Sequence, residues 1–429
     1  MNSASLVSVI QTIWLVIFSF VLLGSSVANA TVQIDTHVGH IEVQDQSQDT
    51  QKRAAKDALL QVLVKMSGTT QVEDIAGVRA ALRNPNQYLR SYRFNERRDA
   101  LYYVAEFDPQ GLTQILRREN LPVWGNRRPE SIIWLAVEDE RGQRHIVEEA
   151  AKSPVSDAIR NTAQARGIRV SLPLMDLTDN QAISVYDIWG RFAKTLVSAS
   201  SRYGVDYVVA ARLYKNNGSE VPTLPAPDQD KLLNDALNKD WDRPVQDLEN
   251  ELEGDGASSA YRAQSPAAAS DVMPFSSREF ESMMARQGEG AYALDWVFIR
   301  NGDVKTGSLY GDDPADLTAL LMEGYASYLA DIFSIKPGVQ QGEPQQLQIS
   351  VANLDSLAHF VNAQRYLKSL SVVDQVTLTR QSRSVGTFTL SLLGSPQDFL
   401  NTMALENRLS PVKDAFGQPV QGYNFYWNQ

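Results

Sequence analysis

Apolar residues recur along the chain at helical spacings between short alternating stretches, which predicts mixed α and β structure throughout. In residues 49–66 an apolar side chain returns every three or four positions, the pattern of a helix with one buried face. Residues 88–94 and 101–107 alternate as strands do. We therefore expect residues 31–121 to form an α+β domain.

A second pattern, typical of α/β structure, covers residues 130–335. Residues 132–137 are almost continuously apolar, which indicates a strand covered on both faces. A helical pattern at 155–166 leads directly into a second strand at 168–172. Because strand and helix alternate over short connections, we expect a sheet with parallel neighbours joined by right-handed crossovers.

The same alternation continues and is then interrupted. Apolar positions predict one helix over residues 188–203, followed by a buried strand at 207–213. Residues 216–291 differ in composition: between positions 228 and 255 there are ten acidic residues against three basic ones. This composition favours a flexible acidic insertion within the α/β domain.

Residues 345–429 have the clearest order of elements. The pattern predicts a strand, a helix, two strands of a hairpin, a helix and a last strand, at 347–351, 354–370, 373–379, 387–393, 395–403 and 423–427. This β-α-β-β-α-β order is that of a ferredoxin-like domain.

Residues 1–30 have the features of a signal peptide. The apolar run at 13–23 has the length of a signal-peptide core and is short for a membrane span. Small residues ending at Ala30 predict cleavage before Thr31, which leaves a periplasmic protein with no membrane span. Because residues 1–12 contain no Lys or Arg, an uncleaved N-terminus anchored in the inner membrane is the alternative.

Charge and composition argue against several classes of function. The 51 acidic and 40 basic residues leave a net charge of -11, so we do not expect nucleic acid as a partner. The chain has no Cys and four His, which excludes thiolate centres and leaves no expected metal site or cofactor. There is no glycine-rich phosphate loop with a following lysine, so ATP is not an expected partner.

Three carboxylates are the candidate binding residues. Asp176 and Asp179 come directly after the expected strand at 168–172, and Asp187 lies at the start of the next helical pattern. Ligands gather beyond the carboxyl ends of strands in open α/β sheets, and paired carboxylates can exchange protons. Aspartates at helix starts also cap free backbone amides, which explains the same residues without a ligand. No residue is assigned a catalytic role.

Three stretches carry a resemblance to a known family: IIWLAVEDERGQ, VSLPLMDLTDNQAISVYDIWGRF and SSRYGVDYVVAARL. They resemble the hallmark stretches of a family of exported proteobacterial proteins catalogued only as a domain of unknown function. The first two expected domains are also similar in layout to periplasmic flagellar-ring subunits and to envelope assembly proteins. The resemblance implies an envelope protein but no activity.

The expected function is that of a periplasmic, non-enzymatic adaptor or envelope-assembly protein, with envelope proteins as its partners. The expected fold is multidomain, with an α+β domain, an α/β domain and a ferredoxin-like domain. The alternative function is a carboxylate-based hydrolase or small-ligand binder that uses Asp176, Asp179 and Asp187.

Overall fold

The computed structural model describes residues 34–97, 100–205, 207–216, 290–300, 302–336, 345–414, 416–418 and 420–428. By its internal contacts the chain separates into two compact units. Unit 1 comprises Met1–Pro129, Ala165–Ile168 and Ser327–Gln429, and unit 2 comprises Glu130–Gln164 and Arg169–Ala326. The three expected domains stay a prediction, and each unit is described by itself.

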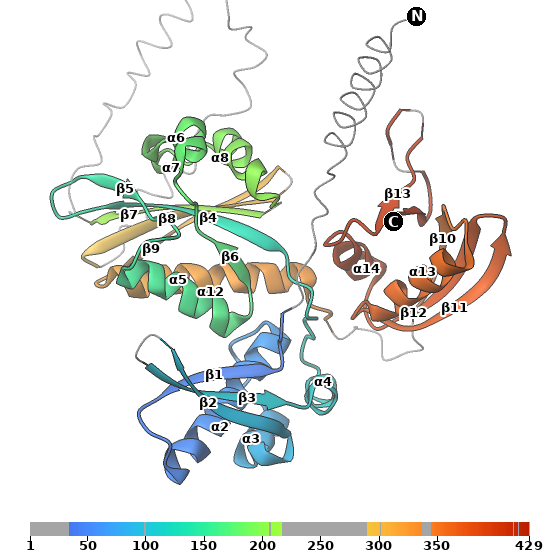
Figure 1. The fold of residues 1–429 in the computed structure, drawn as a ribbon, viewed down its shortest axis with the longest axis horizontal. Coiled ribbons are helices and arrows are strands. Elements are labelled where there is room, and N and C mark those ends of the chain that lie inside the picture. Colours follow the sequence, from blue (N-terminus) through green and yellow to red (C-terminus); the bar gives the residue numbers. More distant parts are fainter. Residues whose placement is uncertain are drawn as a thin grey trace, which may run out of the picture. The chain divides into compact units, whose positions relative to one another are not determined.

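The first part of unit 1 is a three-stranded antiparallel sheet with helices packed on one face (Figure 1). Its elements are β1 (Val38–Val43), α2 (Gln48–Ser67), α3 (Ala76–Arg83), η1 (Pro85–Gln87), β2 (Leu89–Arg97), β3 (Ala100–Phe107) and α4 (Pro109–Arg118). The strand order is β1-β3-β2. The expected α+β pattern is confirmed, and α3 is an additional helix that the apolar spacing did not predict.

Helix α2 begins and ends as its sequence indicates. The side chain of Ser47 accepts a hydrogen bond from the backbone amide of Thr50, which caps the first turn. At the other end Gly68 has a φ of 77°, a left-handed conformation that glycine adopts without the steric cost of a side chain. The apolar face of α2 forms the core of this part with β3 and α4.

The last part of unit 1 is a five-stranded sheet with helices α13 and α14 packed on it (Figure 1). Its elements are β10 (Gln345–Ala352), α13 (Leu357–Ser369), β11 (Val373–Ser382), β12 (Val385–Leu392), α14 (Pro396–Met403), β13 (Leu409–Pro411) and β14 (Asn424–Trp427). The order β11-β12-β10-β14-β13, with β10 and β14 parallel, confirms the ferredoxin-like order of elements and adds the short strand β13.

Unit 2 is built on a six-stranded sheet. Its elements are β4 (Glu130–Glu138), β5 (Arg144–Ile146), α5 (Pro154–Arg166), β6 (Arg169–Ser171), α6 (Leu177–Ala182), α7 (Val185–Trp189), α8 (Ala193–Ser200), η2 (Ser201–Tyr203), β7 (Tyr207–Lys215), β8 (Tyr292–Arg300), β9 (Asp303–Gly311) and α12 (Pro314–Phe333); the ends of α5 and α12 are assigned to unit 1. The strand order is β5-β4-β7-β8-β9, and β6 pairs with β4.

Both faces of this sheet are covered, as the apolar runs predict. Figure 1 shows α6, α7 and α8 on one face and α5 and α12 on the other. Accordingly, Trp134 on β4 packs in the core under α7 and α8, and its neighbours Ile133 and Leu135 are also buried. Strand β4 runs parallel to β6 and β7, which confirms the expected parallel neighbours.

The single helix expected over residues 188–203 is wrong. The structure has α7, then α8 and a final 3-10 turn, because the chain bends between Trp189 and Ala193. Arg191 there has a φ of 56°, which cannot continue a right-handed helix. The apolar spacing predicted one helix because both helices turn their apolar residues to the same core.

Two expectations fall outside the described residues. The signal peptide with its cleavage point at Ala30 and Thr31 lies there, as does the acidic insertion at 216–291 except for its end residues. Strands β7 and β8, on either side of the insertion, pair as antiparallel neighbours. None of the helices described in the structure has the length and apolar content needed to cross a membrane.

Candidate functional site

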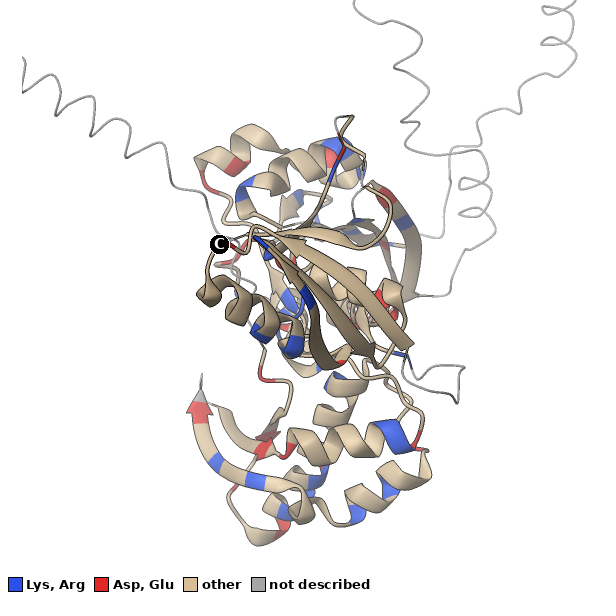
Figure 2. Ribbon diagram, turned by 90° about the vertical axis from the view of Figure 1, so that its right-hand side faces the viewer, with Lys and Arg blue, Asp and Glu red and all other residues tan. Residues whose placement is uncertain are grey.

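The candidate site lies in unit 2, where helices α6, α7 and α8 meet the edge strand β5. All three candidate aspartates are in this region, and so is a surface hollow. Acidic and basic residues both occur on these helices, seen at the top of Figure 2. Charge alone therefore does not single out a ligand for this face.

Asp176 caps helix α6 and pairs with an arginine. Its carboxylate accepts hydrogen bonds from the backbone amides of Thr178 and Asp179, both at 3.0 Å. The guanidinium of Arg202 donates to both carboxylate oxygens, at 2.6 and 2.9 Å. The hydrogen bond from Arg202 is the largest cause that holds the pKa of Asp176 well below its usual range. Asp176 is therefore ionised at neutral pH and has no proton to donate as an acid.

Asp179 is fully buried beneath this cap. It accepts hydrogen bonds from Arg202 at 2.8 Å, from the hydroxyl of Tyr203 at 2.6 Å and from the backbone amide of Met175 at 2.9 Å. Burial is the largest cause that raises the pKa of Tyr203 to about 12, and the hydrogen bond to Asp179 is the second largest. A buried carboxylate with three donors is held as a structural anchor, and it leaves no oxygen exposed for a ligand.

Asp187 belongs to a different local structure. The hydroxyl of Ser184 accepts from the amide of Asp187, and the carboxylate of Asp187 accepts from the amide of Ser184 at 2.8 Å, which makes a reciprocal capping box at the start of α7. Arg202 thus brings Asp176 and Asp179 together, whereas the Asp187 carboxylate bonds within its own turn.

A stack of side chains around Trp189 joins β5, α7 and β7. The guanidinium carbons of Arg144 and Arg212 lie 3.9 and 5.7 Å from the centre of the Trp189 ring, and the ring of Tyr214 lies 5.9 Å away. Arg144 also donates to Glu138 at 3.0 Å. Cations over the face of an aromatic ring are attracted by its electron density, so the stack fixes α7 on the sheet.

Beneath the stack, Asp295 on β8 is a second buried carboxylate. Arg212 donates to one of its oxygens at 2.9 Å, and Ser308 donates to the other at 2.6 Å. Tyr214 also donates to Asp295, and burial with this neighbouring charge raises the pKa of Tyr214 to about 12. These bonds tie three adjacent strands together across one face of the sheet.

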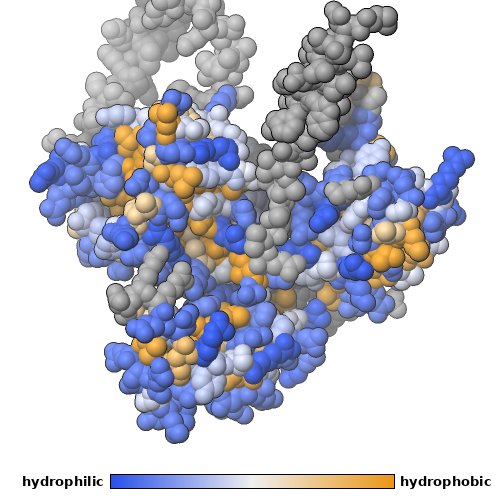
Figure 3. All heavy atoms as spheres, in the orientation of Figure 1, coloured by the Kyte–Doolittle hydropathy of each residue, from blue (hydrophilic) through white to orange (hydrophobic). Residues whose placement is uncertain are grey.

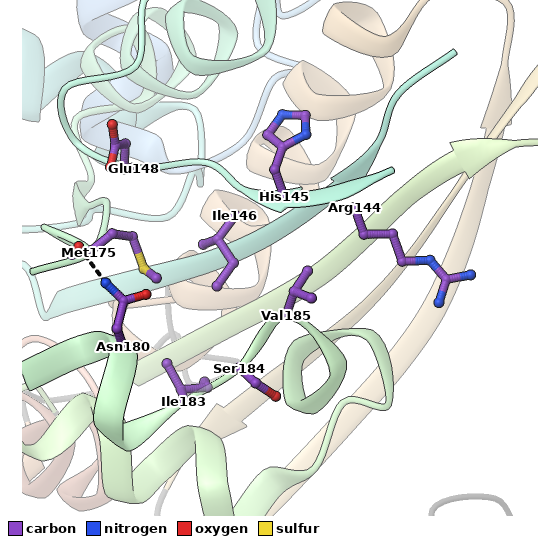
Figure 4. Close-up of a pocket in the computed structure, with 9 residues that line it drawn as sticks. All are labelled: Arg144, His145, Ile146, Glu148, Met175, Asn180, Ile183, Ser184 and Val185. Carbon is purple, nitrogen blue, oxygen red and sulfur yellow. Dashed lines mark hydrogen bonds between the residues drawn. The ribbon is translucent and has the colours of Figure 1, made fainter. Parts of the chain in front are cut away.

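A hollow of about 500 Å³ opens beside β5 (Figure 4). In this view Ile146 and Val185 point toward each other, and His145 points away from them. At one end the side-chain amide of Asn180 donates to the carbonyl of Met175 at 2.8 Å. The lining is completed by Arg144, Glu148, Ile183 and Ser184. The lining is mixed: four of its nine residues are apolar and five are polar, so it can take an apolar side chain next to polar groups.

Next to the hollow, helices α6 to α8 and their flanking segments expose several large apolar side chains. Figure 3 shows apolar atoms gathered over this part of unit 2, near α6 and α7 of Figure 1. We call this the apolar surface; its members are Leu174, Leu177, Tyr186, Phe192 and Val197. Leu177 is 74% exposed and Tyr186 68% exposed. Such a gathering of exposed apolar side chains typically marks a place where another molecule binds.

The arrangement offers little for catalysis. The carboxylates of Asp176, Asp179 and Asp187 all bond backbone amides, and two of them share Arg202. Within the described ranges, no three His, Asp or Glu side chains gather as they would around a metal ion. The surface and the hollow can instead hold an apolar partner by burial of area.

Sequence reasoning missed most of what shapes this site. Arg202 and Asp295 are distant in sequence from the groups they hold, and nothing in their local pattern indicates pairing. Strand β5 had a usable signal, because Gly142 follows a polar turn after an apolar strand, as in a hairpin. No sequence signal indicated that the residues of the apolar surface are exposed, since they have the same spacing as core residues.

The chain matches two family models, each over a separate part. A domain of unknown function, DUF8605, matches residues 30–125, and DUF2066 matches residues 347–418. No curated protein matches the chain. Among solved structures, a Staphylococcus aureus homoserine dehydrogenase is similar at 12% identity over 25% of this chain, with a TM-score of 0.11. The match spans 28% of that enzyme's length, and at this TM-score it supports no conclusion.

The candidate site lies outside both family matches, in the part of the chain between them. The chain is thus a multidomain protein with two domains of unknown function, one before and one after the candidate site in the sequence.

Proposed function

We propose that this protein is a non-enzymatic adaptor that binds another protein through the apolar surface over α6 to α8. One observation carries the proposal: five large apolar side chains from one short stretch of chain are exposed on helices α6 to α8 and the segments that join and precede them. Burial of such side chains against a partner is favourable by about 25 cal/mol per Å² of apolar area removed from water. Large exposed patches of this kind are typical of interaction sites.

The contacts of the aspartates support an adaptor over a carboxylate-based hydrolase. A general acid needs a pKa near the working pH, and Arg202 holds the pKa of Asp176 far below it. Asp179 is buried among its donors, and Asp187 is held in a capping box. Each aspartate thus has a role in the fold that needs no substrate.

We place the adaptor in the periplasm, with envelope proteins as its partners. Support for this comes from the sequence alone: the apolar run at 13–23, the small residues that end at Ala30, and the absence of Cys. Retention of the N-terminus as an inner-membrane anchor is the alternative.

A second candidate function is the binding of a small apolar ligand. The hollow beside β5, at about 500 Å³, falls within the range of volumes typical of ligand sites. A thermal-shift screen of the purified full chain against small apolar molecules tests this candidate directly. A ligand that raises the unfolding midpoint of the wild type but not of a Val185→Lys variant would favour it.

The adaptor proposal is tested by cross-linking the full chain to its partners in envelope extracts. Leu177→Ser with Tyr186→Ser removes the two most exposed members of the apolar surface. A matched control is Leu320→Ser on α12, which removes a side chain that is 53% exposed elsewhere on unit 2.

We expect specific cross-linked products with the wild type and the control, and their loss with the double variant. Products that are the same for all three proteins would refute the proposal. Equal unfolding midpoints for the variants would show that the loss is one of binding and not of folding.

A further inference from the structure

We propose that the hollow beside β5 binds an extended segment of a partner protein that carries both basic and apolar side chains, and that this segment adds to the sheet as a new strand along β5. The inference rests on the proposed adaptor function and names the chemistry of the partner. It follows from three features of unit 2: an open backbone edge, a hollow of mixed lining next to it with an apolar side chain on each of two facing walls, and an acidic flank.

The outer edge of β5 has backbone groups without a strand partner in the described part of the chain. Strand β5 is the last strand in the order of its sheet, and it pairs with β4 so that His145 lies opposite Val137. The amide of Val147 bonds Leu135 at 2.8 Å, and the amide of Asp139 bonds Gln143 at 2.8 Å.

Residues in antiparallel strands alternate between pairs that bond each other and pairs that do not. Because the bonded positions on this side are 143, 145 and 147, the amides and carbonyls of Arg144 and Ile146 face away from β4. A partner strand that approaches from that side meets two donors and two acceptors in a row. This is the arrangement used when a peptide adds to a sheet edge.

The hollow lies where one face of such an added strand would project its side chains. Ile146 and Val185 line it from opposite sides (Figure 4). The backbone between α6 and α7 is itself extended, with φ and ψ of -148° and 143° at Ile183. Alternate side chains of a strand point to one face, so every second residue of the partner would enter the hollow and should be apolar.

The flank of the hollow is acidic. Residues 138–149, which include β5 and its two connections, contain five acidic residues and two basic ones. Glu138 pairs with Arg144 and Glu149 with Arg160, which leaves three acidic residues against Arg141. Glu148 lines the hollow, is half-buried and makes no ion pair with any residue that the structure describes. Helices α6 to α8, over residues 173–204, contain three residues of each sign. The local field therefore favours a partner segment that carries Lys or Arg.

The length of β5 limits what can bind. It has three residues, and short edge strands pair poorly with arbitrary strands. An added strand gains enough binding free energy only if its apolar side chains also fill the hollow and its basic groups lie against the acidic flank. Specificity would thus come from side chains, and the backbone edge would fix the direction and register.

The test uses a labelled peptide that alternates lysine and valine, and the full chain. Two control peptides keep the length: one alternates glutamate and valine, and the other is the lysine peptide with every backbone amide methylated. Binding is measured by fluorescence anisotropy at low salt. Since all three peptides meet the unaltered protein, the comparison does not depend on whether a variant folds.

We expect the lysine peptide to bind at least about tenfold more tightly than either control. Amide hydrogen exchange should slow at Arg144 and Ile146 when the peptide binds, whereas His145, already bonded to β4, should change little. Equal binding of the methylated peptide would overturn strand addition, and equal binding of the glutamate peptide would overturn the preference for a basic partner.

Two variants locate the peptide. Val185→Lys places a charge in the hollow and should abolish binding. The matched control is Val304→Lys on β9, at the opposite end of the strand order from β5, where the side chain is exposed and outside the lining; it should leave binding unchanged. Glu148→Gln should weaken the binding of the lysine peptide and reduce the salt dependence of that binding. If no peptide binds while Leu177 and Tyr186 are still required for partner capture, the adaptor proposal stands and this inference fails.

Discussion

The guanidinium carbon of Arg144 lies 3.9 Å from the centre of the Trp189 ring, which couples the edge strand β5 to helix α7. Ile146, on the same face of β5, lines the hollow, and Val185 of α7 lines it from the other side. The contact between Arg144 and Trp189 therefore helps to set the distance between the two walls of the hollow.

The first prediction measures this contact. Replacement of Arg144 by Met keeps the length of the side chain but removes its charge, and Trp189→Leu removes the ring. A double-mutant cycle should give a coupling of about 1 kcal/mol, because a cation over Trp at a half-exposed site contributes about that much.

The cycle is read from thermal unfolding of the four proteins, with Arg141→Met as the control. Arg141 is exposed in the adjacent turn, and no stacking contact joins it to a ring in the described chain. Coupling of the same size for Arg141 and Trp189 would contradict a specific stack.

The second prediction separates Asp176 from Asp179. Asp176→Asn keeps an oxygen that can accept from the amides at the start of α6 but loses the charge that Arg202 pairs with, so stability should fall, by less than at the buried Asp179. Asp179→Asn should cost about 2 kcal/mol or more, because a buried charged acceptor of Arg202 and Tyr203 is lost. Thermal unfolding of both variants measures the difference. Equal, small losses at both positions would mean that Asp179 is not held as the structure shows.

The acid sensitivity of the same group gives an independent check. Arg202 lowers the pKa of Asp176, so the folded state binds a proton at Asp176 less readily than the unfolded state does. Its contribution is present above the usual pKa of 3.8 and is lost as the pH falls further. An Arg202→Met variant should lose stability less steeply than the wild type below that pH.

The third prediction concerns Lys65, which is buried in α2 with its ammonium donating to the carbonyl of Val38 at 2.8 Å. Burial is the largest cause that lowers its pKa from 10.5 to about 8, and the nearby charge of Arg128 lowers it further. Between these two pH values the unfolded chain binds more protons than the folded one. The stability should therefore rise with pH in this interval, by on the order of 3 kcal/mol at most.

The comparison with Lys65→Met isolates this group, since the variant has no proton to lose there. Between pH 7 and pH 10 the unfolding midpoint of the wild type should rise relative to that of the variant. The buried Tyr103, whose pKa burial raises to about 12, should not ionise in this range. A difference in unfolding midpoint between the two proteins that does not change with pH would show that Lys65 is not buried as a charge.

The fourth prediction tests the packing of α2 on β1. A Cβ atom at Gly39 would lie 2.7 Å from the backbone oxygen of Ala58, closer than such atoms approach in proteins. Gly39→Ala should therefore destabilise the protein by about 1 to 3 kcal/mol. Gly324→Ala, in the interior of α12 with open space around the position, should stabilise it by about 1 kcal/mol. Thermal unfolding of the two alanine variants decides, and a stable Gly39→Ala protein would contradict the contact.

The fold was predicted well wherever local pattern decides it. The continuous apolar run of β4 indicated a strand covered on both faces, and the structure buries both its faces. Apart from the short strand β13, the order of elements from β10 to β14 followed from spacing alone, because each element buries one face and its period shows in the sequence. The break between α7 and α8 could not be seen, because a bend at Arg191 leaves the apolar spacing almost unchanged.

For the candidate site the sequence indicated only which residues to consider. The cap roles of Asp176 and Asp187 follow from their place at helix starts. Which aspartate is buried is decided by Arg202 and Tyr203, whose hydrogen bonds to Asp179 depend on how separate elements pack.

The sequence by itself determined most of the elements, their order and the faces that they bury, because periodicity is a local property of the chain. The prediction from it missed α3, the short strands β5 and β13, and the break between α7 and α8. Only the tertiary structure decided that Arg144 stacks on Trp189 and that Leu177 and Tyr186 stay exposed. Exposure and contact between distant residues depend on what packs against each element, and that is a property of the folded chain as a whole.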